Sequence, residues 1–245
     1  MFEQFWLEES QLAPNSGYSL FGITHLIFIG LIILIIIFMC RYFSRLPKNK
    51  QASCLKVIAW LTLIIEIVKD CYLAYLGKFT VGYWPIHLCG LGIFLNLAHA
   101  YSGNKILGEV SFALIMPGAV SAILFPNWLA YPAISYYNFH CYLAHTLLVL
   151  YALLAFRGGI IKPKISNHWM ITLFLAIVAP LVYVFNLYNG TNFLFINYPE
   201  PGSPLELLGK WFGNPGYLIP FALLAFLVTF SLEFIGQKID SRHGL

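Results

Sequence analysis

Long apolar stretches recur along almost the whole chain, and they constrain its fold more than any other feature. A helix that spans a membrane needs about 20 mostly apolar residues. Stretches of roughly this length lie at 22–42, 54–77, 84–101, 105–125, 138–156, 169–189 and 216–234. No polar insert of domain size interrupts them. We therefore predict an all-α integral membrane protein, with one polytopic domain over residues 1–245 and about seven transmembrane helices.

Composition supports a membrane rather than water as the main solvent. Hydrophobic residues make up 60% of the chain and charged residues only 10%, whereas soluble domains carry about 25% charged residues. The formal net charge of +4 does not indicate a nucleic-acid partner, because the basic residues lie in short loops and form no stripe with interleaved aromatics. Membrane lipids are the predicted partners.

Lysine and arginine residues between the predicted spans indicate the orientation, because cytoplasmic loops are enriched in them. With the N-terminus outside, the inner segments hold ten basic residues and the outer segments hold two, Lys78 and Lys210. The sequence therefore predicts an outside N-terminus and a cytoplasmic C-terminus in the cell membrane. The outer connection 190–215 is rich in proline, glycine and aromatic residues, and it is predicted to be a capping or re-entrant loop.

Ionisable side chains inside a bilayer are costly, so each one is a functional hypothesis. Glu66, Lys69 and Asp70 lie on one stripe of the span 54–77 by helical spacing. Glu66 and Lys69 are predicted to form an internal ion pair, with Asp70 near the outer end. A structural polar clamp between helices is the other explanation of this stripe.

The third span contains a candidate nucleophile, Cys89. Pro85 fits the first helical position, which predicts that Cys89 lies about one turn into the helix, near the positive end of its dipole, where a thiolate is favoured. His87 is predicted to point away from it. The alternative to a nucleophile is a cysteine that only packs against apolar neighbours in the core. Helical spacing predicts one shared face that carries Cys89, Gly92, Asn96 and His99.

The fifth span supplies a candidate base. Asn138, Cys141 and His145 share one predicted face, whereas His140 points elsewhere. Cys89 and His145 both follow the outer end of their helices by one to two turns, so they are predicted to lie at the same depth. An imidazole there would take the thiol proton and return it to the leaving group. Interhelical hydrogen bonding by the histidines is the alternative.

Three asparagines at the outer end of the sixth span, Asn186, Asn189 and Asn192, are predicted to orient His145 or to stabilise an oxyanion. The motifs GxSxG, HExxH and the P-loop do not occur. Metal binding by the group Asp70, His87, His140 and His145 lacks a diagnostic spacing. We expect neither a metal nor a cofactor.

Several motifs resemble those of the YwaF-type bacterial integral membrane family. They are Trp84 to Cys89 (WPIHLC), Tyr142 to Leu147 (YLAHTL) and Asn186 to Phe195 (NLYNGTNFLF), with an acidic residue at Glu66. Trp84 stands where the family usually has leucine. That family is similar to a human transmembrane lysophospholipid acyltransferase. The resemblance covers helices two to seven and implies Cys89 as nucleophile and His145 as base.

Together these observations predict a membrane-embedded acyltransferase, or a lipid acyl hydrolase, that acts on acyl chains of phospholipids or lysophospholipids through a thioester on Cys89. The site is predicted to face the extracytoplasmic leaflet. The competing hypothesis is a transporter or a lipid-binding membrane protein whose polar cavity binds without reacting. The charged stripe of the second span favours this alternative, because thiol chemistry does not require it.

Overall fold

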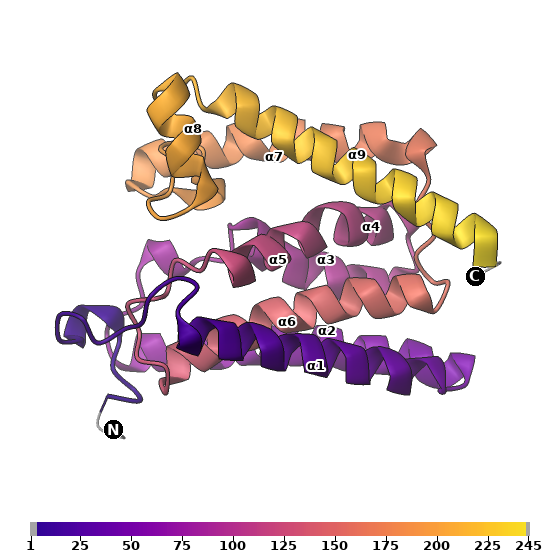
Figure 1. Ribbon diagram of the computed structural model, residues 1–245, viewed down its shortest axis with the longest axis horizontal. Coiled ribbons are helices and arrows are strands. Elements are labelled where there is room, and N and C mark those ends of the chain that lie inside the picture. Colours follow the sequence, from indigo (N-terminus) through magenta and orange to yellow (C-terminus); the bar gives the residue numbers. More distant parts are fainter. Residues whose placement is uncertain (1–3, 244–245) are drawn as a thin grey trace.

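The computed structural model describes residues 4–243, and the secondary structure assigned within them is helical. Figure 1 shows its long helices lying nearly parallel to one another. The helices are α1 (Ile23–Ser44), α2 (Lys48–Tyr75), α3 (Leu88–Ser102), α4 (Lys105–Val110), α5 (Met116–Leu124), α6 (Tyr136–Arg157), α7 (His168–Asn189), α8 (Pro204–Phe212) and α9 (Leu218–His243). A π-helical turn, η3 (Ser111–Ile115), joins α4 to α5. Short 3-10 turns are η1 (Glu9–Gln11), η2 (Val81–Tyr83), η4 (Ile165–Asn167) and η5 (Phe193–Phe195).

Six helical segments of the described chain are long and apolar enough to cross a membrane. They cover Ile23–Ser44, Lys48–Tyr75, Lys105–Leu124, Tyr136–Arg157, Ile165–Asn189 and Leu218–Ser241. Helix α3 has 15 residues, which is about 22 Å at ~1.5 Å per residue and less than the ~30 Å of a hydrocarbon core. The predicted all-helical, multi-pass architecture agrees with this result, whereas the third predicted span is shorter than expected.

The start of α3 differs from the prediction in a way that matters for the site. His87 has an extended backbone (φ −58°, ψ 154°) and precedes the first helical residue, Leu88. Pro85 therefore lies in a turn outside the helix, where the N–H of Ile86 donates to the carbonyl of Trp84 at 2.7 Å. The prediction that the helix begins at Trp84 with Pro85 in its first turn is wrong. Cys89 is the second residue of α3.

Other boundaries also shift. Helix α2 begins at Lys48 rather than Cys54, and α9 continues to His243 rather than Phe234. The fourth span is interrupted by η3, where the N–H of Met116 donates to the carbonyl of Ser111, five residues earlier. Proline has no N–H to donate within a helix, so Pro117, directly after this point, explains the widened turn. Part of the predicted outer loop forms α8, which begins with Ser203 accepting a hydrogen bond from the N–H of Leu205.

The chain crosses the bundle in alternating directions (Figure 1). The N-terminal segment, η2, the connection 125–135 and the loop that carries α8 gather at one end, on the left of Figure 1. The C-terminal end of α9 lies at the opposite end. The connections predicted to lie outside thus share one end of the bundle, and that end is called the outer end below. Which side of the membrane it faces remains a prediction.

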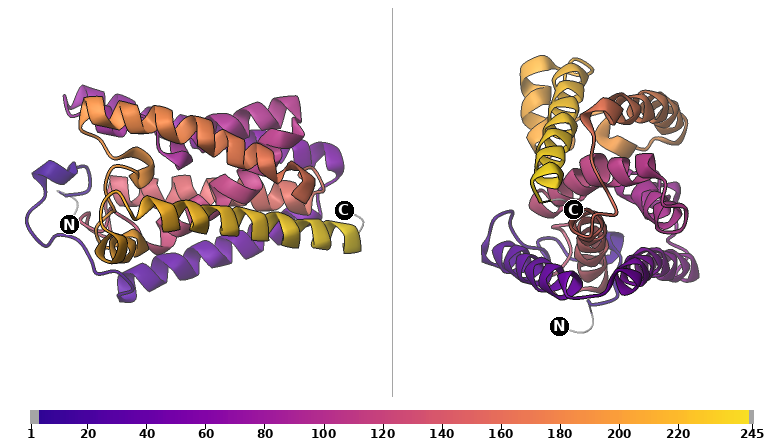
Figure 2. Two further views of the ribbon diagram at one scale, coloured as in Figure 1. Left: turned by 90° about the horizontal axis from the view of Figure 1, so that it is seen from above. Right: turned by 90° about the vertical axis from the view of Figure 1, so that its right-hand side faces the viewer.

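Burial is uneven among the helices, and α6 lies in the middle of the bundle (Figure 2). In the most apolar window of α6, 67% of the residues are buried, against 11% in α1 and in α9. Because α1 is apolar on all sides yet mostly exposed, its surface suits lipid rather than water. Helices α7, α8 and α9 form a separate layer on one side of the other helices (Figure 2). We call this the C-terminal layer.

Candidate functional site

The turn before α3 positions the candidate nucleophile. A Cβ added to Gly90 would lie 2.6 Å from the backbone carbon atoms of Pro85, so this turn folds back directly onto the first turn of the helix. Cys89 lies in that first turn and is half-buried. The first N–H groups of a helix have no partner inside the helix. No side-chain cap bonds to those of α3, so Cys89 lies in a turn that keeps unused backbone donors.

His145 is oriented by its own helix. Its Nδ1 lies 2.7 Å from the carbonyl oxygen of Cys141, and since a carbonyl only accepts, Nδ1 carries the hydrogen. The lone pair is then on Nε2, which fixes this nitrogen as the potential proton acceptor. The ring stacks on Trp128 with a centroid distance of 5.0 Å and an interplanar angle of 21°. His145 is half-buried, as Cys89 is.

Cys89 and His145 lie in the same region but are not hydrogen-bonded to each other in the described structure, residues 4–243. Both lie within electrostatic range of the Glu66 carboxylate. His87 is close enough to His145 to interact with it electrostatically. The structure thus brings the predicted pair to one region at the outer end, without a hydrogen bond between them in this conformation.

A charged network adjoins this region. Lys69 contacts both Glu66 and Asp70, the latter at 3.2 Å. The predicted Glu66–Lys69 ion pair is therefore confirmed. His140 points away from the face of Asn138 and Cys141, as predicted, and its Nε2 lies 3.2 Å from the second carboxylate oxygen of Glu66. This contact joins α6 to α2.

Two further predicted residues, Asn96 and Asn138, join separate segments of the chain. The side-chain oxygen of Asn96 accepts a hydrogen bond of 2.6 Å from Ser111 in η3, and both residues are buried. The oxygen of Asn138 accepts a hydrogen bond of 2.7 Å from Tyr18, while its amide donates to the carbonyl of Ala133. The predicted face of α3 is confirmed in its buried part, which consists of Gly92, Asn96 and His99.

The asparagines in the last turn of α7 lie where the outer loop begins, and Asn186 bonds to that loop. The amide of Asn186 donates to the carbonyl of Phe193 and to Asn197, and its oxygen accepts from Thr191 and from the Phe193 N–H. With both amide hydrogens donated, Asn186 is not a free oxyanion donor in this conformation. The amide of Asn189 donates to the carbonyl of Phe185 in its own helix.

Asn192 and its neighbours complete the loop. Its oxygen accepts from the backbone N–H groups of Asn197 and Tyr198. Its amide donates to the carbonyl of Tyr198 at 3.0 Å. Burial raises the pKa of Glu200 above its usual value. The oxyanion role predicted for Asn189 and Asn192 stays a prediction, whereas the structure shows their part in shaping the loop.

This loop reaches the site through His87. The N–H of Leu194 donates to Nδ1 of His87 at 3.3 Å. The His87 ring packs against Phe193 and Phe195, with centroid distances of 4.9 and 5.1 Å. The Asn186 network therefore supports His87 from the C-terminal layer, two residues from Cys89. This is a positioning function that the sequence pattern alone did not indicate.

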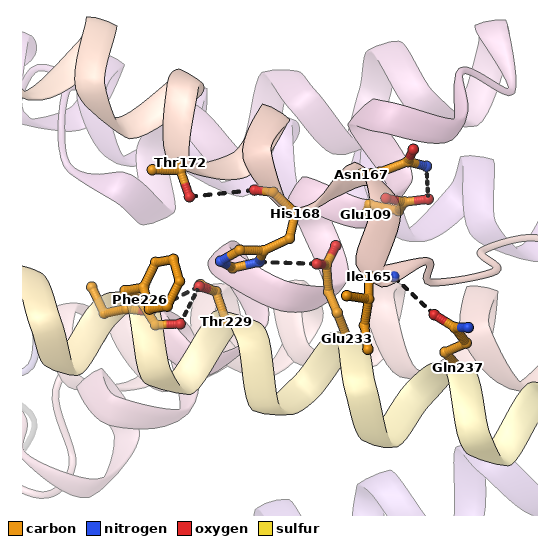
Figure 3. A network of polar contacts seen from close by, with 10 residues as sticks. Glu109, Ile165, Asn167, His168, Thr172, Phe226, Thr229, Glu233 and Gln237 are labelled. Carbon is orange, nitrogen blue, oxygen red and sulfur yellow. Dashed lines mark hydrogen bonds and ion pairs between the residues drawn. The ribbon is translucent and has the colours of Figure 1, made fainter.

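Sequence reasoning missed a second polar cluster, which is drawn in Figure 3. It lies near the end of the bundle opposite the outer end, which we call the inner end. Glu109, His168 and Glu233 are all buried there. The cost of ionisable groups in a membrane, which singled out Glu66, applies equally to Glu109 and Glu233 and would have found them. Among residues 4–243, no group of three or more His, Cys, Asp or Glu side chains has a geometry that would hold a metal ion.

Comparison with known proteins places the whole bundle in one family. A family model described as the TMEM164 family matches residues 20–232, a range that runs from the start of α1 into α9 and includes both Cys89 and His145. Comparisons with curated proteins and with solved structures gave no match. This match names neither the YwaF-type family nor its human acyltransferase relative, so the resemblance to both stays a prediction. The chain is a multi-pass membrane protein that belongs to the TMEM164 family.

Proposed function

We propose that the protein is a membrane-embedded acyltransferase or lipid acyl hydrolase that uses Cys89 as nucleophile and His145 as base. The substrates are acyl chains of phospholipids or lysophospholipids. One observation carries the proposal. Nδ1 of His145 is occupied by the Cys141 carbonyl, which leaves Nε2 to accept a proton in the region that also holds the half-buried thiol of Cys89.

The chemistry begins with transfer of the Cys89 thiol proton to Nε2 of His145. The thiolate attacks the carbonyl carbon of a lipid ester, and the resulting oxyanion accepts hydrogen bonds from N–H groups at the start of α3. The ester C–O bond then breaks, and the leaving alkoxide takes the proton from His145. The acyl group remains on Cys89 as a thioester.

In the second half a lysophospholipid hydroxyl, or water, attacks the thioester carbonyl. His145 removes the proton of the attacking hydroxyl and returns it to the Cys89 sulfur as the C–S bond breaks. A lipid acceptor makes the reaction an acyl transfer, and water makes it a hydrolysis. Both halves require the sulfur and Nε2 to come within about 3.2 Å of each other when substrate is bound.

Intact-protein mass spectrometry after incubation with a fatty-acyl p-nitrophenyl ester tests this proposal. We expect one acyl adduct on the wild-type protein and on Cys141→Ser, and none on Cys89→Ser. Cys141 is the matched control because it is half-buried and precedes His145 by one turn. His145→Ala is expected to slow acylation by about 10² to 10⁴-fold, the usual contribution of a positioned base. Equal labelling of wild type and Cys89→Ser would refute the nucleophile.

The second candidate function is lipid binding or transport without reaction. It is favoured by the network of Glu66, Lys69 and His140, since charged contacts of this kind suit recognition of a polar headgroup. An open, apolar cavity of about 460 Å³ lies nearby, lined by Trp6, Val68, Tyr72 and Tyr136. A lipid that binds to wild type and Cys89→Ala equally well, with no acyl adduct on either, would favour this candidate over the enzyme.

A further inference from the structure

The inner polar cluster connects three parts of the chain that are far apart in sequence. Glu109 belongs to α4, Asn167 to η4, His168 to α7 and Glu233 to α9. Figure 3 shows Glu233 beside the His168 ring and Glu109 beside Asn167, where the C-terminal layer meets α4. This cluster lies near the other end of the bundle from Cys89, so it forms no part of the proposed acyl-transfer site.

Each glutamate uses one of its two carboxyl oxygens. Oε1 of Glu109 accepts a hydrogen bond of 2.9 Å from the Asn167 amide. Oε2 of Glu233 lies 3.0 Å from Nδ1 of His168. The second oxygens, Oε2 of Glu109 and Oε1 of Glu233, are buried and have no partner. Both side chains are almost completely enclosed, since Glu109 is 2% exposed and Glu233 is 0% exposed.

Both carboxyl groups are buried in one cluster, and burial disfavours the charged form of each, so ionising both has a large free-energy cost. The charge of Glu109 acts directly on Glu233, and like charges in one site disfavour double ionisation. Buried carboxyl groups without a cationic partner take up a proton instead of remaining ionised. The second oxygen of each carboxyl group is an acceptor without a donor, so the cluster has room to bind one more positively charged group.

The surrounding residues supply only part of that charge. Lys105 on α4 and Lys164 before η4 act electrostatically on Glu109, but neither is among the hydrogen-bonded or ion-paired partners of the glutamates. His168 faces Glu233 and packs edge-on against Phe226 and Phe230, with centroid distances of 4.9 and 5.5 Å. One imidazole can balance one carboxylate. The second carboxylate of the pair remains uncompensated.

We propose that Glu109 and Glu233 form a proton-binding site that holds one proton between them in the folded protein. The proton is the ligand that matches the site, because the described residues offer no three-ligand arrangement for a metal ion. With the proton bound, one carboxyl is neutral and the other pairs with His168. Without it, both carboxyl groups are negatively charged where α4 meets the C-terminal layer, and this layer is held less tightly to the other helices.

Infrared difference spectroscopy tests the site, since a protonated carboxyl group has a carbonyl stretch that a carboxylate lacks. At neutral pH we expect this band in the wild-type protein and its absence in Glu109→Gln/Glu233→Gln. Glutamine keeps the size of the side chain and is neutral, which favours folding of the variant. The control is Glu206→Gln, because Glu206 on α8 forms an exposed pair with Lys210 and should leave the band unchanged.

The single variant Glu109→Gln shows whether the proton belongs to the pair. Removal of the neighbouring charge lets Glu233 ionise beside His168, so the band should also disappear in this variant. A band that persists there would overturn the shared site and assign the proton to Glu233 alone. Equal spectra of wild type and the double variant would refute the proposal altogether.

The dependence of stability on pH gives an independent readout. The folded pair keeps a proton that the unfolded chain releases near pH 4.3, the usual pKa of glutamate. Stability should therefore fall as the pH rises from about 4.3 to the pKa of the pair, by up to tenfold in the folding equilibrium constant per pH unit. The double variant should lose this slope, whereas an unchanged slope would contradict the site.

Discussion

Removal of Lys69 should destabilise the bundle strongly, because it leaves two carboxylates without their shared cation. The Lys69 side chain is 12% exposed and that of Glu66 is 14% exposed, so solvent screens the pair only weakly. Loss of one partner from a buried ion pair costs about 3–5 kcal/mol. Because His140 still contacts Glu66, we expect Lys69→Met to lower the free energy of unfolding by an amount at the lower end of this range, about 3 kcal/mol. For a chain of this size that corresponds to a fall in Tm of roughly 6–12 °C.

The assay is thermal unfolding in detergent of Lys69→Met, Glu66→Gln and the double variant. The double variant removes both charges, so it should recover more than half of the Tm that Lys69→Met loses. The matched control is Lys210→Met, which breaks a Glu–Lys pair on α8 whose side chains are 64% and 40% exposed, and it should not change Tm measurably. If the double variant melts no higher than Lys69→Met, the two residues are not energetically coupled and the reasoning fails.

Two further predictions concern the turn and the orientation. Gly90→Ala should abolish acylation of Cys89, because the new Cβ would lie 2.6 Å from backbone atoms of Pro85. The control Gly30→Ala should be neutral, since nothing lies within 4 Å of a Cβ added there. Normal acylation of Gly90→Ala would show that the turn is unimportant. A cysteine at Asn127 should react with a membrane-impermeant maleimide in intact cells, given the ten-to-two distribution of basic residues, and reaction only after permeabilisation would reverse the topology.

The apolar runs and the helical periodicity predicted the all-helical, multi-pass architecture and the order of its long helices, because both depend on local sequence. The pairing of Glu66 with Lys69 followed from their separation by three residues on one helix. The buried face formed by Gly92, Asn96 and His99 followed from the same periodicity. Contacts within one helix were thus accessible from the sequence.

Contacts between distant segments were not accessible in this way. His140 pairs with Glu66 across two helices, and His168 meets Glu233, which lies 65 residues further along the chain. The start of α3 was also missed, because Pro85 fits a first helical turn and an external turn equally well. Asn186 was expected near His145, but the loop after α7 folds back and uses its whole hydrogen-bonding capacity.

The C-terminal layer is joined to the rest of the bundle by hydrogen bonds that, in the described chain, lie at its two ends. At the outer end the N–H of Leu194 donates to His87, and at the inner end the amide of Asn167 donates to Glu109. Along the seam between these ends, the hydrogen bonds of the described residues include none that joins this layer to the other helices. Lipid tails are as apolar as the side chains they would replace, so an acyl chain that slips into this seam from the bilayer breaks no hydrogen bond on its way in.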